Sequence, residues 1–141
     1  MLETLLEQRL NSKQAGILIT LPDGTTGIDI RQHLCHHYKN ETHPDLLMFD
    51  SGNIKVENIR NMKTFLQNTP AEKMKTLWIA KADTMTKQAA NAFLKSLEEP
   101  TNHTRIILST DTPTQILPTI RSRCALYSVV NDKTIAQSEM T

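Results

Sequence analysis

The sequence predicts an α/β protein: a three-layer α/β/α sandwich built on a mostly parallel central sheet. The first observation is that short apolar runs alternate with helical stretches of about 10 to 15 residues, which is typical of βαβ units. The second is that the strand candidates are continuous apolar runs, as expected when helices cover both faces of a sheet. The third is the length of 141 residues, which suits one domain.

The first predicted elements are a helix, a strand and a second helix. Leucines at helical spacing predict a helix over residues 2–10. Residues 16–21 (GILITL) predict a buried strand that stops at the turn signal Pro22-Asp23-Gly24. A helix is expected over residues 29–38, with Asp29 as its N-cap. The residues expected on its buried face are Ile30, Leu34 and His37.

Four strands and two helices are predicted in the remainder of the chain. The strands are short apolar runs at residues 44–49, 76–80, 105–109 and 125–130. The first helix ends before Pro70. It is expected to be amphipathic, because its apolar residues recur at three- and four-residue steps, namely Val56, Ile59, Met62 and Leu66. The second helix runs from Lys87 to Glu98, with Thr86 as its N-cap and Pro100 as its stop. Its expected buried face comprises Ala90, Phe93, Leu94 and Leu97.

The composition excludes several classes of protein. Hydrophobic residues make up 38% of the chain and charged residues 22%, which is ordinary for a globular protein. The formal net charge is +1, so no overall field attracts nucleic acid or a membrane. No apolar run approaches the roughly 20 residues that span a bilayer, and the first residues lack the apolar core of a secretory signal. Two cysteines, Cys35 and Cys124, cannot form a disulfide framework. We therefore expect a cytoplasmic domain.

The first loop at the carboxyl edge of the sheet lacks the residues of a working phosphate-binding loop. Ligands of such sheets bind at the carboxyl ends of the strands. A phosphate-binding loop there needs glycines, a lysine for the β- and γ-phosphates and a hydroxyl for magnesium. The chain keeps Gly24 and Gly27, but no Gly-Lys-Ser/Thr follows, and Gly27 stands where the lysine is expected. Asp29 adds a carboxylate where the phosphates would lie.

The acidic pair that holds magnesium and orients the attacking water is also missing. Ala80 stands where the first acid is expected, and Asp83 is the only acid in the loop. Asp83 is interpreted as a turn or capping residue. We predict that the chain performs no phosphoryl transfer and binds no cofactor, although an active ATPase with an unusual phosphate-binding loop remains an alternative.

Three segments resemble those of clamp-loader AAA+ subunits. Residues 90–100 (ANAFLKSLEEP) resemble the NALLKTLEEP helix, residues 118–124 (PTIRSRC) the TI-x-SRC segment, and residues 54–60 (IKVENIR) an I-x-V-D-x-I-R helix opening. The resemblance covers residues 42 to 128. The most similar family is the delta-prime subunit of the bacterial DNA polymerase III clamp loader, whose nucleotide site is commonly degenerate. The P-loop NTPase fold in its AAA+ form is therefore implied.

The resemblance implies a domain organisation and a function. Residues 1–130 would form the AAA+ ATPase-like domain I and residues 131–141 a polar tail, without the lid and collar domains of the family. The domain would take part in sliding-clamp loading during DNA replication, in association with the DNA polymerase III holoenzyme. Its partners would be the ATPase motor subunit and the delta subunit. The sliding clamp and primed DNA would be reached through the assembled complex, with no membrane. A stand-alone interaction module is a further alternative.

Arg123 is the candidate site residue. In the family, the SRC arginine crosses a subunit boundary to the γ-phosphate of a neighbour's ATP, so the resemblance implies that Arg123 is an arginine finger. A solvated arginine at a helix end is the alternative. Cys124 is expected to be a small buried residue. Glu98 and Glu99 point about 100° apart on a helix and are interpreted as helix-end surface charge.

The only cluster of soft metal ligands spans the predicted second helix and the segment that leads from it to the following strand. Its members are His33, Cys35, His36, His37 and His43. His33 and His37 are four residues apart and share a helix face, which is a possible zinc or nickel contact. A structural zinc site needs four ligands in defined spacings. Since no two convincing ligand pairs occur, we predict solvated or partly packed histidines and no metal.

Overall fold

The structure is a computed structural model, and it describes residues 16–22, 27–40, 42–72, 74–99, 103–130 and 134–137. The helix predicted over residues 2–10, the turn residues 23–26 and Pro100 lie outside these ranges, as do most residues of the predicted tail.

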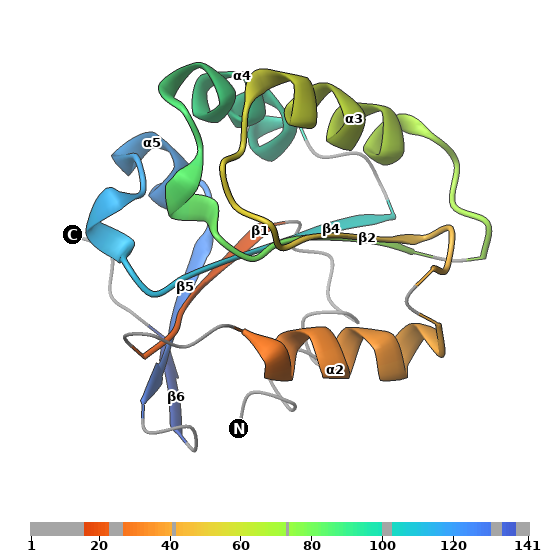
Figure 1. Ribbon diagram of the computed structural model, residues 1–141, viewed down its shortest axis with the longest axis horizontal. Coiled ribbons are helices and arrows are strands. Elements are labelled where there is room, and N and C mark those ends of the chain that lie inside the picture. Colours follow the sequence, from red (N-terminus) through yellow and green to blue (C-terminus); the bar gives the residue numbers. More distant parts are fainter. Residues whose placement is uncertain are drawn as a thin grey trace.

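The described strands form one six-stranded sheet in the order β2-β3-β4-β1-β5-β6 (Figure 1). The strands are β1 (Gly16–Thr20), β2 (Leu46–Phe49), β3 (Lys75–Ile79), β4 (Thr104–Thr110), β5 (Ala125–Val130) and β6 (Thr134–Gln137). All neighbouring pairs are parallel except β5 with β6, which is antiparallel. The five strands expected from the sequence are confirmed, with bounds that differ by at most two residues. β6 adds an edge strand where the sequence predicted only a polar tail.

Helices cover both faces of the sheet and complete the predicted three-layer sandwich (Figure 1). The helices are α2 (Ile28–Tyr38), α3 (Val56–Gln67), α4 (Lys87–Glu98) and α5 (Pro118–Arg121), with 3₁₀ turns at Ala82–Thr84 and Pro113–Gln115. α3 and α4 lie side by side on one face, and α2 lies on the other. None of the helices in the described ranges has the length and apolar character that crossing a membrane requires.

Two of the helix starts show how local sequence sets the boundaries. Thr86 caps α4 as predicted, because its Oγ1 accepts a hydrogen bond from the Ala89 amide at 3.1 Å. The prediction that Asp29 caps α2 is wrong. The N-cap is Gly27, whose carbonyl accepts from the Ile30 amide at 3.0 Å, so Asp29 lies inside the first turn. Its carboxylate still complements the positive end of the helix dipole.

The sheet separates two apolar clusters because successive side chains of a strand point to opposite faces. Leu18 of β1 packs under α3 and α4, whereas Ile17 and Ile19 pack against α2. Ile30 and Leu34 of α2 are buried as expected. His37 is exposed, contrary to prediction, because the row of residues spaced by four along the helix continues to Tyr38 instead.

The buried face of α4 agrees with the sequence at all but one position. Ala90, Phe93 and Leu97 are buried, and Phe93 is among the most completely covered large side chains, with 0% of its surface exposed. Leu94 is only partly buried at the edge of the cluster. The predicted burial of Leu94 is therefore only partly correct, because the buried face of the helix is shifted toward Ala89, which is fully buried.

Candidate functional site

The start of α2 disfavours a lysine at the position where a phosphate-binding loop would carry one. Gly27 adopts a left-handed backbone with φ of 80°, which disfavours any residue with a Cβ. A Cβ at this position would lie 3.2 Å from Cζ2 of Trp78 and 3.5 Å from Cδ1 of Leu21. A residue with a side chain at this position would therefore have a strained backbone. Its side chain would also contact the apolar atoms of Trp78 and Leu21.

Trp78 is the residue that closes this edge, and sequence reasoning treated it only as part of a strand. Its side chain is 1% exposed, and its Nε1 donates to Oγ of Ser109 at 3.0 Å. Ser109 Oγ in turn donates to the Ala80 carbonyl at 2.9 Å. Because the indole and the hydroxyl are both hydrogen-bonded, the ring is stable in this position. The Trp78 ring therefore fills the space beside Gly27 at the start of α2.

Asp83 links the turn after β3 to the end of β4 at the same edge. It lies in the 3₁₀ turn after β3, and its Oδ1 accepts from Oγ1 of Thr110 at 2.7 Å. The turn role expected of Asp83 is confirmed. Ala80, which stands in place of an acid, is buried. Across the described ranges, no group of three or more histidine, cysteine or acidic side chains is arranged to hold a metal ion.

The histidine cluster is dispersed. His33 and Cys35 of α2 are partly buried, and His36 is exposed. His43 lies in the connection to β2, where its Nδ1 accepts from the Asp45 amide at 3.0 Å and its Nε2 is 3.4 Å from Oε1 of Glu72. The contacts of His43 are therefore those of a packed residue in a turn.

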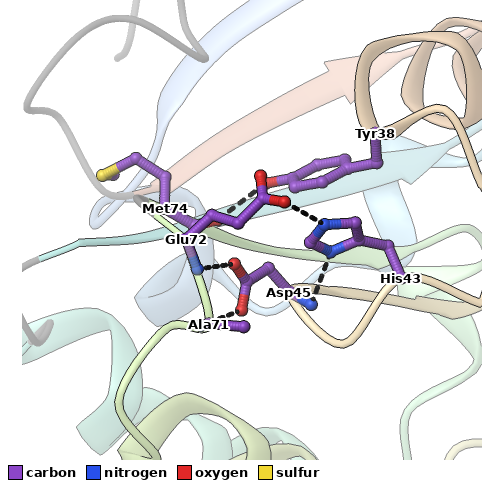
Figure 2. Close-up of polar contacts among 6 residues, drawn as sticks. All are labelled: Tyr38, His43, Asp45, Ala71, Glu72 and Met74. Carbon is purple, nitrogen blue, oxygen red and sulfur yellow. Dashed lines mark hydrogen bonds and ion pairs between the residues drawn. The ribbon is translucent and has the colours of Figure 1, made fainter.

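A second polar cluster, which the sequence did not reveal, surrounds Asp45 (Figure 2). Asp45 is 1% exposed, and its two carboxylate oxygens accept from the amides of Ala71 and Glu72 at 2.7 and 2.9 Å. Tyr38 donates to the Met74 carbonyl at 3.0 Å, and burial is the main cause that raises the pKa of its phenol. These contacts link the segment that precedes β2 to the segment that precedes β3. The cluster is structural, because its acceptors and donors are satisfied within the chain.

Arg123 lies in the turn between α5 and β5 and is exposed. Its Nη1 donates to the Thr119 carbonyl at 2.8 Å and to Ser122 Oγ at 3.2 Å. Its Nε is 3.5 Å from Oε1 of Glu98, at the end of α4. Two of the three segments that resemble clamp-loader motifs, residues 90–100 and 118–124, therefore meet through their side chains. Glu98, expected to be surface charge alone, is the ion-pair partner of Arg123.

Arg123 belongs to the amino edge of the sheet, opposite the Gly27 edge. It precedes β5, which runs parallel to β1, and a Cβ at Gly16, the first residue of β1, would lie 3.6 Å from the Arg123 carbonyl oxygen. Gly27, by contrast, follows the last residue of β1. β1 has five residues, and a parallel strand of that length spans about 16 Å. The guanidinium is therefore out of reach of the chain's own nucleotide edge.

Cys124 is not a nucleophile. It is 8% exposed, and burial raises the pKa of its thiol to about 12, so it stays protonated at neutral pH. Its expected role as a small buried residue is confirmed.

The sheet order and the helices around it define the class of protein: an AAA+ domain of the P-loop NTPase-like fold. RuvB from Thermotoga maritima shares this fold with a TM-score of 0.61 at 12% identity, over 88% of this chain and 42% of that chain. The chain belongs to the DNA polymerase III delta subunit family, whose model matches residues 17–133.

Individual relatives agree with this family. A DNA polymerase III subunit delta' from Haemophilus influenzae is 33% identical over 101 residues, covering 69% of this chain and 31% of the relative. The Bacillus subtilis delta' subunit is 40% identical over 93 residues, covering 64% and 28%. A solved gamma subunit-related protein from Thermotoga maritima superposes with a TM-score of 0.80 at 32% identity, covering 93% of this chain and 46% of that one. The chain thus spans about a third of the length of these curated relatives.

Proposed function

We propose that this chain is the non-catalytic AAA+ domain of a delta-prime-type clamp-loader subunit. In this role it takes part in loading a sliding clamp onto primed DNA during replication, and it offers Arg123 to the ATP of a neighbouring motor subunit. Family membership and the delta' relatives support the replication role.

The observation that carries this proposal is the position of Arg123. The residue is exposed and lies at the sheet edge opposite the chain's own nucleotide edge. An arginine finger acts on a phosphate held by another chain, so it must be accessible and point away from its own domain's site. Arginine suits this task because its planar, permanently charged guanidinium donates several hydrogen bonds to phosphate oxygens.

The closed edge at Gly27 and Trp78 supports the non-catalytic part of the proposal. A lysine for the phosphates is disfavoured there by the backbone of Gly27 and by Trp78, and Ala80 supplies no carboxylate for magnesium. The domain would then act as a rigid body that presents Arg123 to the ATP of the neighbouring motor subunit. Its partners are the ATPase motor subunit and the delta subunit, and it reaches the clamp and primed DNA through the complex. We place it in the cytoplasm, where a replication complex acts on DNA.

The proposal predicts that the chain enters a complex with its motor subunit. Mixed with the motor subunit, the delta subunit, the sliding clamp and ATP, the chain should co-elute with them in size-exclusion chromatography. Omitting the motor subunit should abolish co-elution with the clamp, because contact with the clamp is indirect. A chain that elutes alone from the complete mixture would support an interaction module unrelated to clamp loading.

A further inference from the structure

The Arg123 guanidinium is held through two of its three nitrogen atoms. Its Nη1 is hydrogen-bonded to the Thr119 carbonyl and to Ser122 Oγ, and its Nε lies 3.5 Å from the Glu98 carboxylate. Among the residues that the structure describes, Nη2 has no hydrogen-bond or ion-pair partner.

The three contacts come from two different elements. Thr119 and Ser122 belong to α5 and the turn after it, and they fix one nitrogen through local bonds. Glu98 is the last residue of α4, and it is the only one of the three partners that carries a charge. An arginine side chain loses rotamer freedom when it is ordered. The contacts of Nη1 alone would leave the guanidinium free to rotate. The contact of Nε with Glu98 restricts this rotation.

We propose that Glu98 is a positioning residue that orients the Arg123 guanidinium for the neighbour's γ-phosphate. This inference rests on the proposed finger role of Arg123. The exposed fractions of the two side chains are 35% for Arg123 and 48% for Glu98. A pair exposed to this degree contributes little to folding stability. We therefore expect the ion pair to act by orienting the Arg123 guanidinium and not by stabilising the fold.

Glu99 supplies a matched control. It is the next residue, it is also exposed, and it lies at the same end of α4. Glu99 is the C-cap of α4 with a non-helical backbone, and the carboxylate that pairs with Arg123 is that of Glu98. Glu98→Gln and Glu99→Gln remove the same charge from the same helix end. A general effect of charge or of the helix dipole would therefore appear in both variants.

The test measures clamp- and DNA-stimulated ATP hydrolysis in the clamp-loader complex that contains this chain. Glu98→Gln should lower kcat about 2- to 5-fold, the range that follows from the worth of an exposed ion pair. The KM for ATP should be unchanged, because the finger contact strengthens in the transition state. Glu99→Gln should leave both constants at the wild-type values. The melting temperature should be the same for both variants.

A double-mutant cycle separates positioning from any independent role of Glu98. In the Arg123→Ala background, Glu98→Gln should have no further effect, because the residue it orients is gone. Equal effects of Glu98→Gln and Glu99→Gln, or an additional loss in the Arg123→Ala background, would overturn the positioning role. If Arg123→Ala slows hydrolysis and Glu98→Gln does not, the finger stands and the positioning role fails. If Arg123→Ala has no effect, both fail.

Discussion

Changing Arg123 to alanine should slow the neighbour's clamp- and DNA-stimulated ATP hydrolysis severely. Arginine fingers in phosphoryl-transfer systems contribute roughly 10³- to 10⁵-fold to the rate at one site, because they stabilise charge that develops on the transferred phosphoryl group. A loader with several ATP sites should show a smaller net loss. The measurement is steady-state hydrolysis by the reconstituted complex, supplemented by single-turnover hydrolysis at the site that faces this chain.

Stability measurements and a conservative variant serve as controls for Arg123. The alanine variant should keep its melting temperature, because the side chain is exposed and its ion pair with Glu98 is a surface pair. Arg123→Lys should restore little activity, since an ammonium keeps the charge and loses the planar array of donors. Normal clamp loading by the alanine variant would disprove the finger assignment.

Replacing Phe93 with alanine should lower the free energy of unfolding by roughly 3–5 kcal/mol. The ring is completely buried between α4 and the sheet, so its removal forfeits the burial of an aromatic side chain and leaves a cavity. This loss is a large share of the roughly 5–15 kcal/mol that stabilises a typical domain. Urea denaturation followed by circular dichroism measures the change.

Leu94 provides the comparison for Phe93. It is the next residue of α4 and is only partly buried, so Leu94→Ala should cost clearly less than Phe93→Ala. An unchanged melting temperature for Phe93→Ala, or a larger loss for Leu94→Ala, would show that a different face of α4 packs on the sheet.

Elements with strong periodicity could be predicted from the sequence. The five parallel strands are short apolar runs, and α3 and α4 carry buried residues at three- and four-residue steps, so local pattern was sufficient. The cap of α4 was equally clear, because Thr86 acts on an amide only three residues away. β6 was missed, because its four residues (TIAQ) lack a strong apolar run and depend on pairing with β5.

Contacts between distant residues could not be predicted in this way. The Arg123–Glu98 pair joins positions 25 apart in the sequence, and Asp45 caps amides 26 and 27 residues away. No helix or strand periodicity in the sequence indicates that residues so far apart are in contact. Trp78 closes the nucleotide edge for the same reason, since its contact with Gly27 arises only when β3 lies below the start of α2. The missing lysine and acid were visible in the sequence, but what fills their place was not.

The claim that this chain works without a nucleotide of its own is tested most directly by titrating it with ATP and magnesium in a calorimeter. The closed edge at Gly27 and Trp78 predicts no binding tighter than about millimolar, with or without magnesium, because the main charge-assisted phosphate contacts are missing. A magnesium-dependent dissociation constant of about micromolar, which corresponds to roughly 8 kcal/mol of binding free energy, would contradict the non-catalytic role and favour an active ATPase.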